Sequence, residues 1–190
     1  MGPSASFYFD LASPEAYLAA ERILQVLPGA AAWQPVLARE LGPAPAHLER
    51  PALERRVREL ELQPLRMPAR FPFDSALAMR VATYAQSIGR VVAFAQAAFR
   101  QAYAGGHDLC QPDRVLIAAA ACEMHPAAVL AAERLRSTGE RLRERTQAAR
   151  AAGVRSVPAV LVDGRVFHGE GALEQAALHM RDAAIGAGAR

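Results

Sequence analysis

Apolar and polar residues recur with two different periods in the N-terminal part of the chain. The short apolar run Ser6–Phe9 predicts a strand, and Ala31–Leu37 predicts a second one. Between them, apolar residues recur at three- and four-residue spacing, which is typical of an amphipathic helix. The repeating positions are Tyr17, Ala20, Leu24 and Leu27. Because a helix joins the two strands, this β-α-β order favours a parallel pair.

The middle of the chain, from Leu41 to Gly153, has helical spacing that proline interrupts. Helices are expected at Pro51–Leu62, Asp74–Ser87, Val91–Tyr103, Pro112–Ala121 and Pro126–Ala152. The segment Gln63–Phe73 contains prolines that cannot lie inside one helix, so we expect an irregular surface segment or a cleft wall there.

Strand character returns near the C-terminus. Pro158–Val162 and Val166–Phe167 flank an Asp163-Gly164 pair, which predicts a hairpin, and Ala172–Ile185 predicts a closing helix. The order β-α-β, helices, β-β-α indicates an α/β protein with a thioredoxin-like fold and a large all-helical insertion. The expected boundaries are 1–41 and 153–190 for the thioredoxin-like domain and 42–152 for the insertion.

Composition narrows the classes of partner. The chain has a net charge of +3, and its 22 basic residues, all arginine, mostly alternate with glutamate along helical segments, which is typical of solvated helix faces and not of a nucleic-acid surface. No window approaches the ~20 apolar residues of a membrane span, and no basic leader precedes an apolar stretch, so we expect a cytoplasmic protein without a membrane partner. Cys110 and Cys122 form neither a CxxC pair nor a zinc spacing, so we expect two free thiols and no metal.

Ser13 is the first candidate for chemistry. Serine before Pro14 is a common helix N-cap, and capping alone would explain it. However, this position follows the first strand, where open α/β sheets bind ligands at exposed helix N-termini. The two roles are compatible, so both stay open at this point.

The second candidate is Ser156-Val157-Pro158, just before the third strand. Proline is tolerated at the start of a strand, so its position requires no function. A cis bond between Val157 and Pro158 would instead expose the Val157 backbone to an extended peptide, which would pair with it as with an edge strand.

These segments also resemble a known family. Residues 7–19, FYFDLASPEAYLA, are similar to the opening of the 2-hydroxychromene-2-carboxylate isomerases, which belong with the kappa-class glutathione transferases to the DsbA-like branch of the thioredoxin superfamily. The similarity continues in the same order through most of the chain. It is carried by Arg56, Pro64, Pro68, Phe71-Pro72, Ala78-Met79-Arg80, residues 153–158 (GVRSVP), Val162-Asp163-Gly164 and Phe167-His168-Gly169.

The resemblance implies a glutathione-dependent isomerase that acts on a 2-hydroxychromene-2-carboxylate-like aromatic keto acid or hemiketal, and it implies a homodimer. Ser13 would stabilise the thiolate of glutathione, since the chain supplies no thiol of its own there, and Val157 and Pro158 would bind the tripeptide. Further cofactor contacts are expected from Pro45, Glu170 and Gly171, and substrate contacts from Phe9, Arg56 and Phe71.

Three of the residues in these segments fit a plainer role as well. Phe9 fits a core position, Arg56 fits the solvated face of an arginine-rich helix, and His168 fits a structural position on the hairpin.

Departures from the family leave alternatives open. The family's asparagine after the second strand falls on Pro43, and the aspartate that receives the γ-glutamyl ammonium falls on Gly171, although Glu170 is one position away. A kappa-like glutathione transferase would use the same serine. A non-catalytic DsbA-like protein would bind peptides at Val157, with Ser13 only as a cap. Disulfide exchange is disfavoured, because no cysteine lies near the first helix.

Overall fold

The computed structural model describes residues 5–43, 49–169 and 171–188. Its four-stranded sheet has the order β2-β1-β3-β4. The strands are β1 (Ala5–Phe9), β2 (Ala31–Pro35), β3 (Ala159–Val162) and β4 (Arg165–His168). β1 and β2 are parallel, and the other neighbouring pairs are antiparallel. The β-α-β unit and the C-terminal hairpin predicted from the sequence are therefore confirmed.

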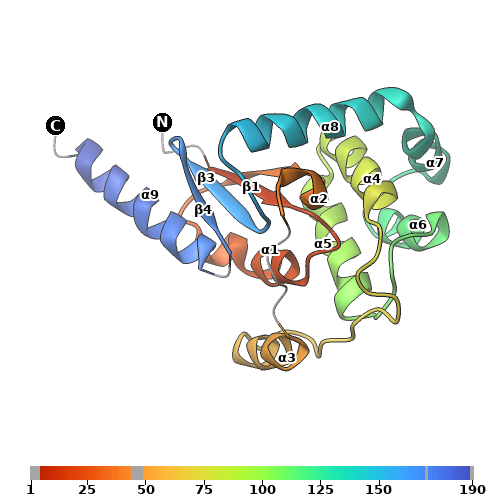
Figure 1. Ribbon diagram of the computed structural model, residues 1–190, viewed down its shortest axis with the longest axis horizontal. Helices are drawn as coiled ribbons and strands as arrows, with labels where there is room; N and C mark the ends of the chain where they lie inside the picture. The colour runs from red at the N-terminus through yellow and green to blue at the C-terminus, as the bar shows by residue number, and fades with distance from the viewer. Residues whose placement is uncertain (1–4, 44–48, 170, 189–190) are drawn as a thin grey trace.

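Helices surround this sheet. They are α1 (Pro14–Val26), α2 (Ala38–Leu41), α3 (Arg50–Glu59), α4 (Ala76–Ser87), α5 (Val91–Tyr103), α6 (Pro112–Ala120), α7 (Pro126–Arg134), α8 (Arg136–Ala151) and α9 (Ala172–Gly188). Figure 1 shows α8 on one side of the sheet and α1 on the other, with α3 next to α1 and set apart from α4 to α7. Residues 60–75 form no helix or strand, as their prolines predict. None of the helices in the described ranges has the length and apolar character of a membrane span.

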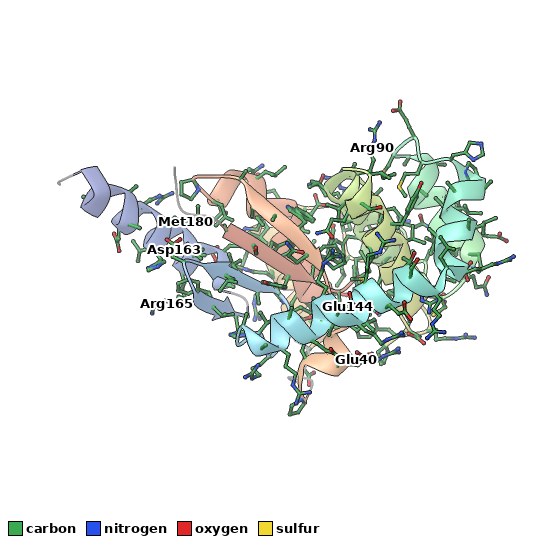
Figure 2. All side chains as sticks on the ribbon, turned by 90° about the horizontal axis from the view of Figure 1, so that it is seen from above. Glu40, Arg90, Glu144, Asp163, Arg165 and Met180 are labelled. Carbon is green, nitrogen blue, oxygen red and sulfur yellow. The ribbon has the colours of Figure 1, made fainter. Side chains whose placement is uncertain are left out.

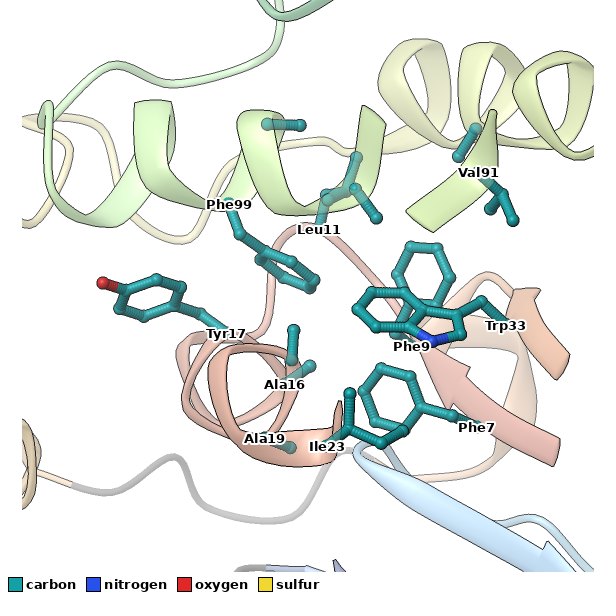
Figure 3. Close-up of a cluster of buried hydrophobic side chains, with 14 of the residues drawn as sticks. Phe7, Phe9, Leu11, Ala16, Tyr17, Ala19, Ile23, Trp33, Val91 and Phe99 are labelled. Atoms are coloured by element: carbon teal, nitrogen blue, oxygen red, sulfur yellow. The ribbon is translucent and has the colours of Figure 1, made fainter. Parts of the chain in front are cut away.

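The strands present alternate side chains to two helical layers. Phe7 and Phe9 of β1 join the main core with Trp33, whereas Tyr8 packs on the opposite face with residues of α2 and α8. The rings of Phe7 and Trp33 meet edge to face with centroids 5.0 Å apart. Figure 3 shows this cluster between α1 and α5, where Phe99 of α5 contacts Phe9. The sheet and the helical insertion therefore share one core.

Two details of the first β-α-β unit differ from the predictions. Leu24 is 67% exposed and Ile23 is buried instead, because neighbouring helical residues point about 100° apart and only the Ile23 side of the last turn faces the core. The second strand ends at Pro35 and not at Leu37. The Leu37 N–H turns away to donate to Thr146 Oγ1 of α8 at 3.1 Å, and α2 begins directly after it.

The prediction of one continuous helix over Pro126–Ala152 is wrong. The structure divides it at Leu135, whose backbone is extended (φ −62°, ψ 123°). Arg80 of α4 fills the corner, since it donates to the Glu133 carbonyl at 2.7 Å and its guanidinium lies against Gly139. A contact between distant segments determines this break, so the local spacing could not reveal it.

Candidate functional site

Ser13 caps α1 directly after the β1–α1 connection, as predicted. Its Oγ accepts a hydrogen bond from the Ala16 N–H at 3.1 Å and donates one to Glu15 Oε2 at 3.0 Å. The residue is 3% exposed. Its single hydroxyl proton is therefore held by Glu15, while the first amides of α1 make this helix end electropositive.

Side chains from the helical insertion hold the β1–α1 connection. The Leu11 N–H donates to Met79 Sδ at 3.3 Å, and Tyr103 Oη donates to the Leu11 carbonyl at 3.3 Å. Burial, followed by the charges of Asp10 and Glu15, raises the pKa of Tyr103 well above its ordinary value, so this phenol stays a neutral donor. α4 and α5 thus fix the loop that leads to Ser13.

Asp10 is a buried carboxylate in the same connection. It is 3% exposed, and its oxygens accept hydrogen bonds from the N–H groups of Ala12 at 2.9 Å and Ala38 at 2.8 Å. Burial raises its pKa, while hydrogen bonds from Ala12, Ser75 and Ala38 and the charge of Arg39 act in the opposite direction. Asp10 therefore ties the end of β1 to the starts of α2 and α4.

The start of β3 lies beside the same end of β1. Tyr8 pairs with Ala159 in antiparallel register, which brings Val157 and Pro158 next to the residues that lead into α1. The bond between Val157 and Pro158 is cis. Within the described ranges, neither the N–H nor the C=O of Val157 has a hydrogen-bond partner.

His168, at the end of β4, anchors the segment before Val157. Its Nε2 accepts a hydrogen bond from the Arg155 N–H at 3.0 Å. Partial burial, and then the charge of Arg155, lowers the pKa of His168, which favours the neutral ring that this bond requires. His168 therefore has a structural role on the hairpin.

A narrow groove runs between α1, α3 and the start of β3. Its lining residues are Glu15, Leu18, Ala19, Arg22, Arg56, Leu60 and Pro158. The groove brings two predicted site residues, Arg56 and Pro158, to one place, next to Glu15. Ser13 is not among the lining residues, and it is linked to the groove through its bond to Glu15. In this conformation the groove has room for about one water molecule.

Each of the two arginines of the groove forms an ion pair with a carboxylate. Arg56 Nη1 donates to Glu59 Oε2 at 3.0 Å within α3, and Arg22 of α1 forms an ion pair with Glu174 of α9. The groove therefore combines guanidinium groups, one carboxylate and an apolar floor. This composition suits a ligand that carries both an anionic group and an apolar body.

Phe9, Phe71 and Gly171 are not among the described residues that line this groove. Phe9 is 0% exposed, because its position on β1 faces the main core, so the expected substrate contact of Phe9 is corrected to a core role. Phe71 is partly buried against the same core. Gly171 lies in the turn before α9, where its carbonyl accepts a bond from the Gln175 N–H. Pro45 and Glu170 lie outside the described residues.

Sequence reasoning did not select Asp10 or Glu15. An acidic residue in the first turn of a helix is common, because it complements the helix dipole, so Glu15 carried no distinctive signal. Asp10 stood directly after a strand and before a helix cap, where carboxylates often bind local amides, and this was a usable signal.

The two cysteines are free, as predicted, and lie away from Ser13 in the chain, after α5 and after α6. Burial is the main cause that raises the pKa of each thiol, Cys110 and Cys122, which makes neither of them a ready nucleophile. Across the described ranges, no group of three or more His, Cys, Asp or Glu side chains could hold a metal ion.

The sequence profile of the DSBA-like thioredoxin domain matches residues 5–181. This chain belongs to the DsbA-like thioredoxin family. A comparison with curated protein sequences finds no match.

Solved structures share the fold of this DsbA-like protein. A 2-hydroxychromene-2-carboxylate isomerase has a TM-score of 0.79 at 19% identity, with 98% of this chain and 96% of that chain covered. A "probable DsbA oxidoreductase" from Streptomyces coelicolor has a TM-score of 0.74 at 16% identity, with 95% and 90% covered. The cytosolic disulfide reductase DsbM from Pseudomonas aeruginosa has a TM-score of 0.60 at 16% identity, with 86% and 87% covered. At these identities the likeness shows the fold alone.

Proposed function

We propose that this DsbA-like protein is a glutathione-dependent isomerase of a 2-hydroxychromene-2-carboxylate-like aromatic substrate. The observation that carries the proposal is the position of Ser13. It caps α1 at the end of the sheet where β3 begins, next to Val157 and Pro158. Both cysteines lie elsewhere in the chain. A nucleophilic sulfur at this helix end would therefore belong to a bound molecule, and glutathione is kept reduced in the cytoplasm, where we expect this protein to act.

The proposed binding mode uses the backbone of Val157. Its N–H and C=O, which have no hydrogen-bond partner among the described residues, would pair with the extended tripeptide. Glutathione is larger than the groove, so it would lie across the end of the sheet where β3 begins. Only its sulfur would point towards Ser13, between Glu15 and Pro158. Arg56 in the groove would receive the carboxylate of the substrate.

The free energies involved are of a plausible size. Lowering the pKa of a free thiol from about 8.5 to about 7 requires roughly 2 kcal/mol of selective thiolate stabilisation. A hydrogen bond to a charged acceptor contributes about 1.5–3 kcal/mol, and a helix N-terminus about 0.3–1 kcal/mol. Ser13 and α1 would suffice if the hydroxyl turned from Glu15 to the sulfur.

The proposed reaction is an addition followed by its reversal. The hemiketal first opens to its keto form, as the bond to the ring oxygen breaks and the hydroxyl proton passes to that oxygen, which becomes a phenol. The thiolate then forms a carbon–sulfur bond to the double bond conjugated with the ketone, and the electron pair of that double bond moves to the carbonyl oxygen. The former double bond is then single and can rotate. When the electrons return, the carbon–sulfur bond breaks and the double bond forms again, so glutathione is released unchanged.

Thermal unfolding with millimolar glutathione tests the proposal. At a concentration ten times the Kd, binding would stabilise the wild-type protein by about 1.4 kcal/mol, a shift of a few degrees in Tm. Ser13→Ala should lose this shift relative to its own Tm, and Ser137→Ala, which removes an exposed serine from α8, should keep it. Absence of any shift in the wild-type protein would reject the proposal.

The consumption of glutathione during turnover distinguishes an isomerase from a glutathione transferase. The isomerase should convert a chromene carboxylate without consuming glutathione, whereas a kappa-like transferase would consume one thiol for each product molecule. Consumption of glutathione in proportion to product would replace the proposed reaction by the transferase.

A non-catalytic peptide-binding protein is the second candidate, and the burial of Ser13 favours it. Ser13 is 3% exposed, and its hydroxyl already accepts from the Ala16 N–H and donates to Glu15. In that case an extended peptide would bind at Val157 with equal affinity in the wild-type protein and in Ser13→Ala, and glutathione would not protect either from unfolding.

A further inference from the structure

The side chain of Glu15 stands between Ser13 and the groove. Its Oε2 accepts the Ser13 hydroxyl proton at 3.0 Å, and the residue also lines the groove. A hydroxyl has one proton, so it cannot donate to a sulfur and to Glu15 together. A thiolate stabilised by Ser13 would therefore have to displace Glu15 as the acceptor.

Charged and titratable groups on several elements face this position. Asp10 of the β1–α1 connection is a buried carboxylate, whereas Glu15 is partly exposed. Burial, followed by the charges of Asp10 and Glu15, raises the pKa of Tyr103 of α5, which stays neutral. Arg22 of α1 and Arg56 of α3 also line the groove, and they form ion pairs with Glu174 and Glu59, respectively. The negative charge of Glu15 is thus the one that contacts Ser13 directly.

Glu15 is poorly suited to take the thiol proton itself. Carboxylic acids are ordinarily much stronger acids than thiols, and Glu15 lies in the first turn of α1, where a helix N-terminus favours an ionised carboxylate. Glu15 therefore acts through its charge and its hydrogen bond.

We propose that Glu15 is a positioning residue that restrains the ionisation of a thiol bound at Ser13, because its carboxylate competes for the hydroxyl proton and repels a negative sulfur. This inference rests on the proposed function and deepens it. A sulfur in hydrogen-bond contact with Ser13 Oγ lies within about 6.5 Å of Glu15 Oε2, since that oxygen is 3.0 Å from Oγ. Removal of this charge should raise the thiolate-to-thiol ratio about tenfold at a given pH.

Titration of the bound thiol tests the inference. Thiolate absorbance of the glutathione complex is followed as the pH is raised, for the wild-type protein, Glu15→Gln and Glu15→Ala. Both variants should lower the apparent pKa of the bound thiol by about one unit. Glu15→Ala should lower it at least as far, because alanine leaves the hydroxyl free to donate to sulfur. Far-UV circular dichroism checks that both variants are folded.

Glu144→Gln is the matched control. It makes the same change of charge on the exposed side of α8, on the other face of the sheet (Figure 2), and should leave the titration unchanged. An unchanged or raised pKa in both Glu15 variants would overturn the inference while the proposed function stands. If the wild-type protein binds no glutathione, the proposed function fails first, and the inference fails with it.

Discussion

At the scale of single residues, the loop before Ser13 depends on hydroxyl groups that the helical insertion supplies. Tyr103 is fully buried and donates to the Leu11 carbonyl at 3.3 Å. Tyr103→Phe removes this donor and should lower the free energy of unfolding by about 0.5–1.5 kcal/mol. Urea unfolding measures the change. Tyr84→Phe is the control, since the Tyr84 phenol has no hydrogen bond within the described ranges, and it should leave stability nearly unchanged.

Ser13 contributes to stability whatever its role in binding. Ser13→Ala removes the oxygen that accepts the Ala16 N–H and should lower the free energy of unfolding by about 1 kcal/mol. Ser13→Asn keeps a capping oxygen, so it should remain closer to the wild-type value. Equal losses in the two variants, measured by urea unfolding, would show that the cap contributes little.

At the scale of elements, the corner between α7 and α8 is shaped by Arg80. Alanine is normally preferred to glycine in a helix by about 1 kcal/mol. At Gly139, however, a Cβ would lie 2.5 Å from Arg80 Nη2. The guanidinium would have to move and lose its bond to the Glu133 carbonyl, which is worth about 1.5–3 kcal/mol. We expect Gly139→Ala to destabilise the protein by about 1 kcal/mol in urea unfolding.

Two comparisons identify the cause of that loss. At Gly186 a Cβ would meet nothing within 4 Å, so Gly186→Ala should not destabilise the protein. In an Arg80→Ala background, Gly139→Ala should become neutral or stabilising, because the obstructing group is gone. Stabilisation by Gly139→Ala with Arg80 present would contradict this account of the corner.

A hydrogen bond from the Arg155 N–H to His168 joins the hairpin to the segment before Val157, and it depends on pH because His168 titrates. Because the pKa of His168 is lowered in the folded protein, the unfolded chain binds more protons just below the ordinary value of 6.5. The stability contributed by neutral His168 is therefore present above pH 6.5 and is lost as the pH falls through the lower folded pKa. His168→Gln, which can still accept from the Arg155 N–H but does not titrate, should reduce this loss in unfolding experiments. Parallel pH profiles of the two proteins would contradict the prediction.

At the scale of the whole molecule, one core joins the sheet to the insertion. Phe9 of β1 packs against both Trp33 of β2 and Phe99 of α5, with centroids 5.7 and 5.9 Å apart. We therefore expect one cooperative unfolding transition. Fluorescence of Trp33, the single tryptophan, reports on the sheet, while far-UV circular dichroism reports mainly on the helices, most of which belong to the insertion.

Coincident urea midpoints from the two signals would support the shared core. Two separated transitions would instead show that the thioredoxin-like part and the insertion 42–152 unfold as independent domains.

The sequence alone determined the elements whose signals are local. The Ser13-Pro14 cap, the Asp163-Gly164 turn and the prolines of residues 60–75 act through local backbone conformation and, at Ser13, through a hydrogen bond to a residue three positions away. The turn shows this directly, because Asp163 (φ 47°) and Gly164 (φ 83°) have the positive φ values that such a hairpin requires. The order of these elements was enough to predict the thioredoxin-like fold.

Only the tertiary structure decided which residues meet. The packing of α1 against the sheet buries Phe9 in the core, and its packing against α3 brings Arg56 to the groove beside Pro158. Both depend on contacts between residues that are distant in the sequence. The break at Leu135 also coincides with a contact between distant residues, since Arg80 binds the Glu133 carbonyl there. The bond from Ser13 to Glu15 joins near neighbours, but it depends on side-chain positions that residue spacing does not specify. Local sequence sets backbone preferences, whereas burial and charge at a site depend on everything that surrounds it.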